Sequence, residues 1–259
     1  MGDKDLNKKK AVHQLGVFGF FAMTASMVMT VYEYPSFASS GFKLVFFLVV
    51  GGLLWFLPVS LCAAEMATVE GWEKGGIYSW VGNTLGQRWG FSALFFQWFQ
   101  ITVGFVTMCF FILAALAYVF KVDALYKNPL AMFIGVAVIV WVLTFAQLGG
   151  TKYTEKISKI GLIGGIAVPI LILNIGLVAY FMTGGKSQID LSVKSLVPDF
   201  SDVKTLVIFA SFILAYMGVE ASASHVHELK EPNKMYPEVM IMLTVLTICL
   251  DAVGGLAVA

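Results

Sequence analysis

Residues 215–222 read Ala-Tyr-Met-Gly-Val-Glu-Ala-Ser, and they place the carboxylate of Glu220 about 15 residues into an apolar run. Polar groups at membrane depth are costly and usually face a cavity or a partner. Small residues lie on both sides of Glu220. This pattern predicts a locally broken helix whose freed backbone groups face a ligand. The alternative is a glutamate near the cytoplasmic end of an unbroken helix, in contact with lipid headgroups.

The first apolar run has a matching interruption, because Thr24, Ala25 and Ser26 lie near its middle. Backbone amides freed there would suit a carboxylate, and Glu220 or carbonyl groups freed near Gly218 would suit an ammonium group. The alternative is an intact helix in which Thr24 and Ser26 bond the carbonyl four residues earlier. The two interruptions fall in spans one and six, five apart, as an inverted repeat of five helices predicts.

The composition is that of a membrane protein. Of 259 residues, 59% are hydrophobic and 13% are charged, whereas a soluble chain has about 45–50% apolar and about 25% charged residues. This excludes a soluble domain, a disordered chain, a collagen and a disulfide scaffold, and the long continuous apolar runs exclude a membrane β-barrel. The net charge is +1 and the basic residues form no broad patch, so we expect the lipid bilayer, and no nucleic acid, as a partner.

Seven apolar segments are long enough to span a bilayer, whose core of about 30 Å needs about 20 residues of helix. The expected fold class is therefore an all-α polytopic membrane protein. The clear connections are Asp123–Pro129, Thr183–Lys204 and His227–Pro237. The seven predicted spans are Val12–Val31, Leu44–Ala67, Trp89–Phe120, Leu130–Leu148, Ile157–Met182, Leu206–Ser224 and Val239–Ala259.

The distribution of Lys and Arg favours a cytoplasmic N-terminus. With residues 1–11 as a cytoplasmic tail, eleven basic residues fall inside and six outside. The first run has about 20 residues and lacks an Ala-x-Ala cleavage site, so we expect a retained helix rather than a signal peptide. The inside set is Lys4, Lys8, Lys9, Lys10, Lys74, Arg88, Lys152, Lys156, Lys159, Lys230 and Lys234, and the outside set is Lys43, Lys121, Lys127, Lys186, Lys194 and Lys204.

Two further carboxylates lie in or beside apolar runs. Glu65 closes the second span and suits either a helix cap or a gate, and Asp251 lies near the middle of the seventh span. His225-x-His227-Glu228 is not a metal motif, because histidines two apart point to different helix faces. There is also no Ser/His/Asp set, so we expect a protein that is not an enzyme and has no metal or cofactor. Ala259 lies inside an apolar run, which suggests the N-terminal part of a longer protein.

Several motifs carry a family resemblance. Glu65, Gly75-Gly76-Ile77-Tyr78 and Trp89-Gly90-Phe91 resemble the region of helices two and three in amino acid–polyamine–organocation (APC) transporters, and Glu228-Leu229-Lys230-Glu231-Pro232 resembles their loop after helix six. Within this superfamily, Phe20–Pro35, Leu61–Val69, Gly149–Thr154 and Tyr216–Ala223 are similar to the bacterial glutamate/γ-aminobutyrate (GABA) antiporters. The first helix best distinguishes these antiporters from other APC members, since most of those have a glycine-rich break where this chain has Thr24-Ala25-Ser26.

The resemblance implies a LeuT-like fold of two inverted five-helix repeats, in which residues 12–199 form the first repeat and residues 200–259 begin the second. It implies exchange of external glutamate for internal GABA, a link to a cytoplasmic glutamate decarboxylase, and acid resistance in the inner membrane of a bacterium. Tyr32 and Glu220 match residues along that family's substrate path. Asp251 departs from the small polar residue expected at its position.

Three alternatives remain open at this point. A different amino acid and amine pair would be exchanged by the same fold, although a cationic substrate would favour a more acidic pathway than this chain has. A cation-coupled amino acid symporter of the same fold would stop when sodium is replaced by choline. From a different class, a non-transporting membrane subunit would bind a partner through its helices.

Overall fold

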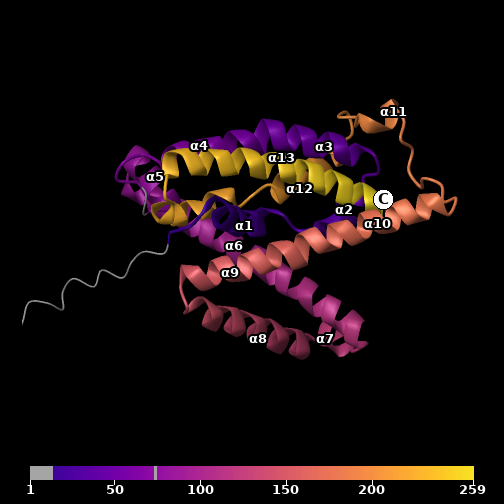
Figure 1. The fold of residues 1–259 in the computed structure, drawn as a ribbon, viewed down its shortest axis with the longest axis horizontal. Helices are drawn as coiled ribbons and strands as arrows, with labels where there is room; N and C mark the ends of the chain where they lie inside the picture. Colours follow the sequence, from indigo (N-terminus) through magenta and orange to yellow (C-terminus); the bar gives the residue numbers. More distant parts are fainter. Residues whose placement is uncertain (1–13, 73–74) are drawn as a thin grey trace, which may run out of the picture. The chain divides into compact units, whose positions relative to one another are not determined.

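The computed structural model describes residues 14–72 and 75–259 (Figure 1). The predicted cytoplasmic tail, residues 1–11, and Lys74 lie outside the described residues. Within these ranges the chain forms helices and no strand, and one isolated bridge pairs Leu15 with Leu229.

Seven helices of the described residues are long and apolar enough to cross a membrane, so the predicted number and order of spans are confirmed. The chain is a multi-pass membrane protein. The spans are α1 (Val17–Val28) with η1 (Val31–Glu33) and α2 (Tyr34–Ala38), α3 (Lys43–Gly51) with η2 (Gly52–Phe56) and α4 (Leu57–Ala67), α6 (Gln87–Phe120), α8 (Pro129–Gln147), α9 (Thr151–Gly161) with η3 (Leu162–Ala167) and α10 (Val168–Met182), α12 (Val203–Ala215) with η4 (Val219–Glu228), and α13 (Pro232–Val258).

The predicted bounds were wrong mainly for the first and seventh spans. The first span continues past Val31 to Ala38, and the seventh begins at Pro232 rather than Val239. The connection predicted at His227–Pro237 is therefore mostly helical. Proline is tolerated in the first turn of a helix because its missing N–H would have no partner there. Pro232 is therefore the first residue of α13, and the helix begins seven residues before the predicted start at Val239.

Two of the long spans contain a π-helical turn shortly before a proline. The turn η2 precedes Pro58, and the turn η3 precedes Pro169. A proline cannot donate a hydrogen bond to the carbonyl four residues earlier, and its ring crowds that group. A local change of winding accommodates both effects without ending the helix.

The described helices form two compact units, one comprising residues up to Gly76 together with Glu155–Ala259, and the other Ile77–Thr154. The second unit holds the short helices α5 (Gly76–Leu85) and α7 (Ala124–Lys127) with the spans α6 and α8. Asn128 caps α8 by accepting a hydrogen bond from the Leu130 amide at 2.9 Å, as the start of a helix requires. A Cβ added to Gly135 of α8 would lie 2.6 Å from Leu113 Cδ2 of α6, so these two helices pack closely.

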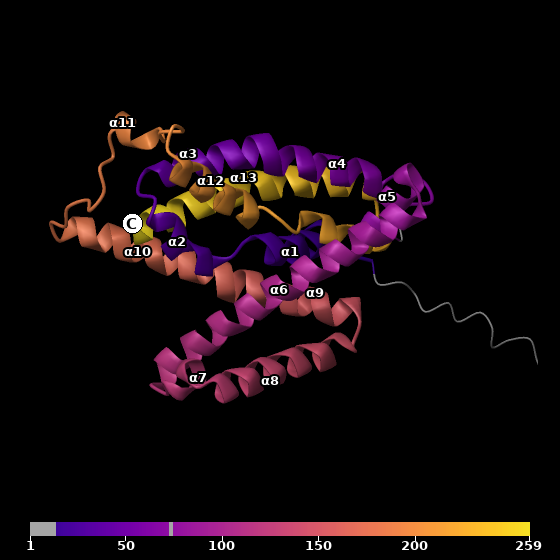
Figure 2. The ribbon, with the colours of Figure 1, turned by 180° about the vertical axis from the view of Figure 1, so that it is seen from behind.

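The first unit is built around α13. This helix contacts α4, α3, α2, α10 and α1, and Figures 1 and 2 show it running beside α3 and α4. Large fully buried side chains of this unit include Tyr34, Tyr216 and Tyr236. Their hydroxyl groups need hydrogen-bond partners inside the unit, so the core combines apolar packing with polar contacts.

Candidate functional site

The first span is broken after Val28. Met29 and Thr30 have extended backbone, and helical structure resumes at Val31. The carbonyl groups of α1 after Ala25 therefore lie at a helix end, where a regular helix would continue to supply donors four residues later. The prediction of an interruption in this span is confirmed, but its predicted position at residues 22–26 was wrong.

The residues predicted to form that interruption lie in regular helix. The Thr24 hydroxyl donates to the Phe20 carbonyl at 2.9 Å, and the Ser26 hydroxyl donates to the Ala22 carbonyl at 2.7 Å. Ala25 is buried, and its carbonyl accepts the amide of Met29 at 2.7 Å. The hydroxyl groups thus satisfy themselves on their own helix, and the break follows three residues after Ser26.

The sixth span is broken where the sequence predicted. The helix α12 ends at Ala215, and Gly218 has a φ of 102° before η4 begins at Val219. A positive φ is strained for residues with a Cβ and ordinary for glycine, so Gly218 allows the chain to change direction here. Glu220 lies in the first turn of η4 and is half-buried.

The two breaks are adjacent in space. A Cβ on Gly218 would lie 3.6 Å from the carbonyl oxygen of Met27, in the last turn of α1. One turn further along η4, the Ser222 hydroxyl lies 3.1 Å from the Tyr236 hydroxyl of α13. The Tyr236 ring packs on Phe20 of α1 with a centroid distance of 5.2 Å. The first contact places the two breaks side by side, and the other two join η4 to α1 through α13.

The predicted site residues occupy two kinds of position. Tyr32 follows the first break by two residues, and Glu220 follows Gly218 by two. Gly218 therefore lies at a break, and Tyr32 and Glu220 lie just after one. Thr24 and Ala25 are instead buried inside α1, and Ser26 is half-buried there. Glu65 is exposed in the last turn of α4.

A second polar cluster adjoins the breaks and contains residues that sequence reasoning missed. Asp251 of α13 is 3% exposed, and the Tyr34 hydroxyl lies beside its carboxyl group. The Tyr216 hydroxyl donates to the Leu48 carbonyl at 2.9 Å. The sequence indicated Asp251 alone. Tyr34 and Tyr216 look like ordinary aromatic residues in an apolar run, and only tertiary structure brings them to the carboxyl group.

The helix α1 packs on α9 at both its ends. A Cβ on Gly19 would lie 2.2 Å from Oε1 of Glu155, so this side chain lies directly on the backbone of α1. Lys159 forms an ion pair with Glu155 at 2.5 Å and lies 5.7 Å from the ring centroid of Phe18. Ser26 also approaches the Ser158 carbonyl, at 3.4 Å.

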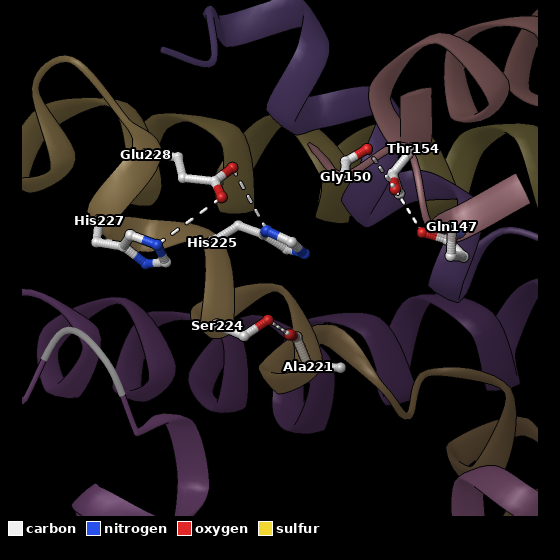
Figure 3. Close-up of polar contacts among 8 residues, drawn as sticks. All are labelled: Gln147, Gly150, Thr154, Ala221, Ser224, His225, His227 and Glu228. Carbon is white, nitrogen blue, oxygen red and sulfur yellow. Dashed lines mark hydrogen bonds and ion pairs between the residues drawn. The ribbon is translucent and has the colours of Figure 1, made fainter. Parts of the chain in front are cut away.

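The histidines after the sixth break face a carboxylate. Figure 3 shows Glu228 between His225 and His227, with nitrogen–oxygen distances of 3.6 Å and 3.8 Å. The Leu15 amide donates to the Glu228 carbonyl at 2.8 Å, which ties the start of span one to the end of η4. Among the residues that the structure describes, no three His, Cys, Asp or Glu side chains are placed to hold a metal ion.

The turn before α9 is stabilised by its own side chains. Gly150 has a φ of 75°, and the Thr154 hydroxyl bonds the Gln147 side-chain oxygen at 2.5 Å and the Gly150 carbonyl at 3.4 Å (Figure 3). Gly149 and Gly150 therefore make a tight connection between α8 and α9.

Comparison with known proteins identifies the relatives of this chain. The family model described as amino acid permease matches residues 15–259. The glutamate/gamma-aminobutyrate antiporter of Lactococcus lactis subsp. cremoris (strain MG1363) is 61% identical over 254 residues, which are 98% of this chain and 50% of that protein. The antiporter of the same name from L. lactis subsp. lactis (strain IL1403) has the same identity and coverage.

A more distant relative matches a similar share of this chain. An uncharacterized transporter of Legionella pneumophila subsp. pneumophila is 32% identical over 253 residues, which are 98% of this chain and 53% of that protein. The chain spans about half the length of the curated relatives it matches.

Proposed function

The chain belongs to the amino acid permease family, and from this premise we propose that the protein is an antiporter that exchanges extracellular glutamate for intracellular GABA by alternating access. The observation that carries this proposal is 61% identity, over 98% of the chain, to two proteins named as glutamate/gamma-aminobutyrate antiporters. A family whose members share the fold can differ in substrate, so the site itself must also suit these substrates.

Glutamate and GABA each present carboxylate and ammonium groups, and the paired breaks supply complementary backbone groups. The end of α1 presents carbonyl oxygens near Met27, which suit an ammonium group. The start of η4 at Val219 presents the opposite, amide end of a helix, which suits a carboxylate. This reverses the arrangement expected from the sequence, in which the first break bound the carboxylate and the sixth bound the ammonium group. We place the substrate beside these two adjoining helix ends.

Side chains next to the breaks complete the proposed site. Glu220 is an acceptor for the ammonium group, and Tyr32 contacts the substrate from the other break. Gly218 allows the backbone to turn toward the substrate because its φ is 102°. Thr24, Ala25 and Ser26 belong to α1, the helix that ends at the first break, and this helix forms one side of the proposed site.

The packing of the first unit supports a moving bundle. Helix α13 of span seven contacts α1, α4 and η4 of spans one, two and six, and η4 also contacts α1 and α4. We propose that they rock together to expose the site to one side of the membrane at a time. In this arrangement Glu155 of α9 contacts Gly19 near the start of α1. This contact would break when the bundle rocks.

The wider role follows from the same exchange. Decarboxylation of glutamate in the cytoplasm consumes a proton, and export of GABA removes the product, so exchange linked to a glutamate decarboxylase would give acid resistance. We place the protein in the inner membrane of a bacterium with its N-terminus in the cytoplasm, on the excess of Lys and Arg on that side. We assign residues 12–199 to a first five-helix repeat and residues 200–259 to the start of an inverted second one.

A competition panel tests the substrate assignment. The full-length gene product is reconstituted in GABA-loaded liposomes, and entry of labelled glutamate is measured with unlabelled amino acids and amines outside, in sodium and in choline medium. We expect glutamate and GABA to compete, arginine and agmatine not to compete, and choline to have no effect. Competition by another pair, or loss of entry in choline, would replace this assignment with a different exchanger or with a symporter.

A further inference from the structure

The seventh span contains a carboxyl group that the proposed substrate site does not use. Asp251 is 3% exposed, and its Oδ1 atom has no hydrogen-bond partner among the described residues. One turn earlier on the same face of α13, Thr247 is 0% exposed, and its hydroxyl oxygen also lacks a partner in the described part of the chain. Buried polar atoms are normally hydrogen-bonded, so this pair requires an explanation.

Within the described ranges, the neighbours of Asp251 offer no positive charge. The titratable groups that face it are Tyr34 of α2, Glu33 of η1 and Tyr216 at the break of span six. The Tyr34 ring is fixed by close contact with Gly254, so its hydroxyl is held beside the carboxyl group. The Tyr216 hydroxyl is engaged with the Leu48 carbonyl at 2.9 Å.

A charged carboxylate is unfavourable in these surroundings. Removing a carboxylate from water without a paired cation costs several kcal/mol, and the nearby Glu33 adds like-charge repulsion. The neutral acid avoids both costs and gains an O–H donor. These surroundings therefore favour the neutral, protonated form of Asp251 in the packed arrangement.

The groups that enclose Asp251 belong to the segments beside the two breaks, which can hinge on α13 while the four spans rock together. Tyr34 lies four residues after the break of span one, and Tyr216 lies at the break of span six. If α2 and this break separate from α13, water reaches Asp251 and stabilises its charged form. Protonation of Asp251 and closure of the two broken helices are therefore linked.

We propose that Asp251 is a proton-binding site of the transport cycle, which holds a proton while α2 and the break of span six pack on α13. When they part, the O–H bond of the carboxyl group breaks, the proton passes to water, and the charge stays on Asp251 until it is protonated again. The inference deepens the proposed transport function and rests on it, since it names the group whose charge opposes closure.

Infrared spectroscopy tests the protonated state without reference to substrate. The full-length protein and the variants Asp251→Asn and Glu238→Gln are reconstituted and measured at neutral pH. Glu238 is an exposed carboxylate on the same helix and serves as the matched control. We expect a carboxylic acid C=O stretch in the wild type and in Glu238→Gln that is missing from Asp251→Asn. The absence of any band that depends on Asp251 overturns the proposal. If Asp251→Asn does not fold, Asp251→Ser replaces it in this comparison.

Exchange measurements test the coupling. Because asparagine is permanently neutral, Asp251→Asn should exchange within about twofold of the wild type near pH 5. Near pH 8 it should exchange at least about tenfold faster, because proton uptake by Asp251 is then less favourable in the wild type and its charge opposes closure. Parallel pH profiles in the two proteins contradict the coupling. Exchange that requires sodium in the wild type but not in Asp251→Asn would make Asp251 part of a sodium site instead. If neither protein exchanges glutamate for GABA at any pH, the proposed function fails, while the infrared result still decides the state of Asp251.

Discussion

Tyr34 and Gly254 are in direct contact: a Cβ added to Gly254 would lie 2.2 Å from Cε2 of the Tyr34 ring. This contact sets the ring of Tyr34 against α13, one turn beyond Asp251. It joins the second half of the broken first span to the seventh span, and it leaves no room for a larger residue at position 254.

Substitution of Gly254 by alanine should therefore be unfavourable. We expect Gly254→Ala to lower stability by about 1–3 kcal/mol through overpacking, although alanine is the better helix former by about 1 kcal/mol. Thermal unfolding in detergent measures the difference. Gly176→Ala is the control, because nothing lies within 4 Å of an added Cβ at that position of α10. Equal unfolding temperatures for the two variants would show that the ring moves freely.

Gly218→Ala tests the backbone of the sixth break. Its cost comes from conformation rather than space, since the nearest atom to an added Cβ is the Met27 oxygen at 3.6 Å. A left-handed backbone costs an alanine about 1–2 kcal/mol. We expect exchange to fall at least about tenfold while the protein still reconstitutes. Gly184→Ala is matched in strain, with a φ of 86° in a connecting loop, and exchange at the wild-type rate is expected there. Loss of exchange in both variants would show a general defect instead.

Glu220→Gln separates charge from shape in the proposed site. The amide keeps the size of the side chain, so the fold should be intact, and exchange should fall at least about tenfold because the acceptor for the ammonium group is weakened. Initial rates over a range of glutamate concentrations measure the effect. Glu65→Gln, on the exposed face of α4, is the comparison. Wild-type kinetics in Glu220→Gln would remove this residue from the mechanism.

Glu155→Gln tests the contact that holds α1 on α9. The carboxylate pairs with Lys159 at 2.5 Å, and the pair is only partly exposed. Its loss should cost less than about 1 kcal/mol of stability but should favour the state in which α1 leaves α9. A cysteine introduced at Ser158 reports this opening, because Ser158 lies beside Ser26 of α1. Faster labelling of that cysteine in Glu155→Gln is expected, and unchanged labelling would mean that the ion pair does not restrain α1.

Hydropathy was sufficient to predict the number and order of the spans, because each needs about 20 apolar residues in a row. The break of span six was also predictable, since Gly218 and its small neighbours interrupt an apolar helix. The break of span one was predicted in the wrong place because Met29 and Thr30 carry no glycine or proline signal. Thr24 and Ser26 gave a false signal, since their hydroxyl groups bond within their own helix.

The surroundings of Asp251 could not be predicted from local sequence. Its position in an apolar run was visible, but its neighbours Tyr34 and Tyr216 come from segments far apart in the chain. Aromatic residues are ordinary in membrane spans, and nothing in their own sequence contexts points to a carboxyl group on α13. Only the packing of the first unit brings these three side chains together.

The most direct test of the proposed function is glutamate entry into liposomes with and without internal GABA. The full-length protein is reconstituted, and uptake of labelled glutamate is followed at an acidic and at an alkaline pH. Entry that requires internal GABA and is matched by release of GABA is the result this account predicts. Glutamate entry that is equal in empty and GABA-loaded liposomes, or no entry at either pH, would contradict it.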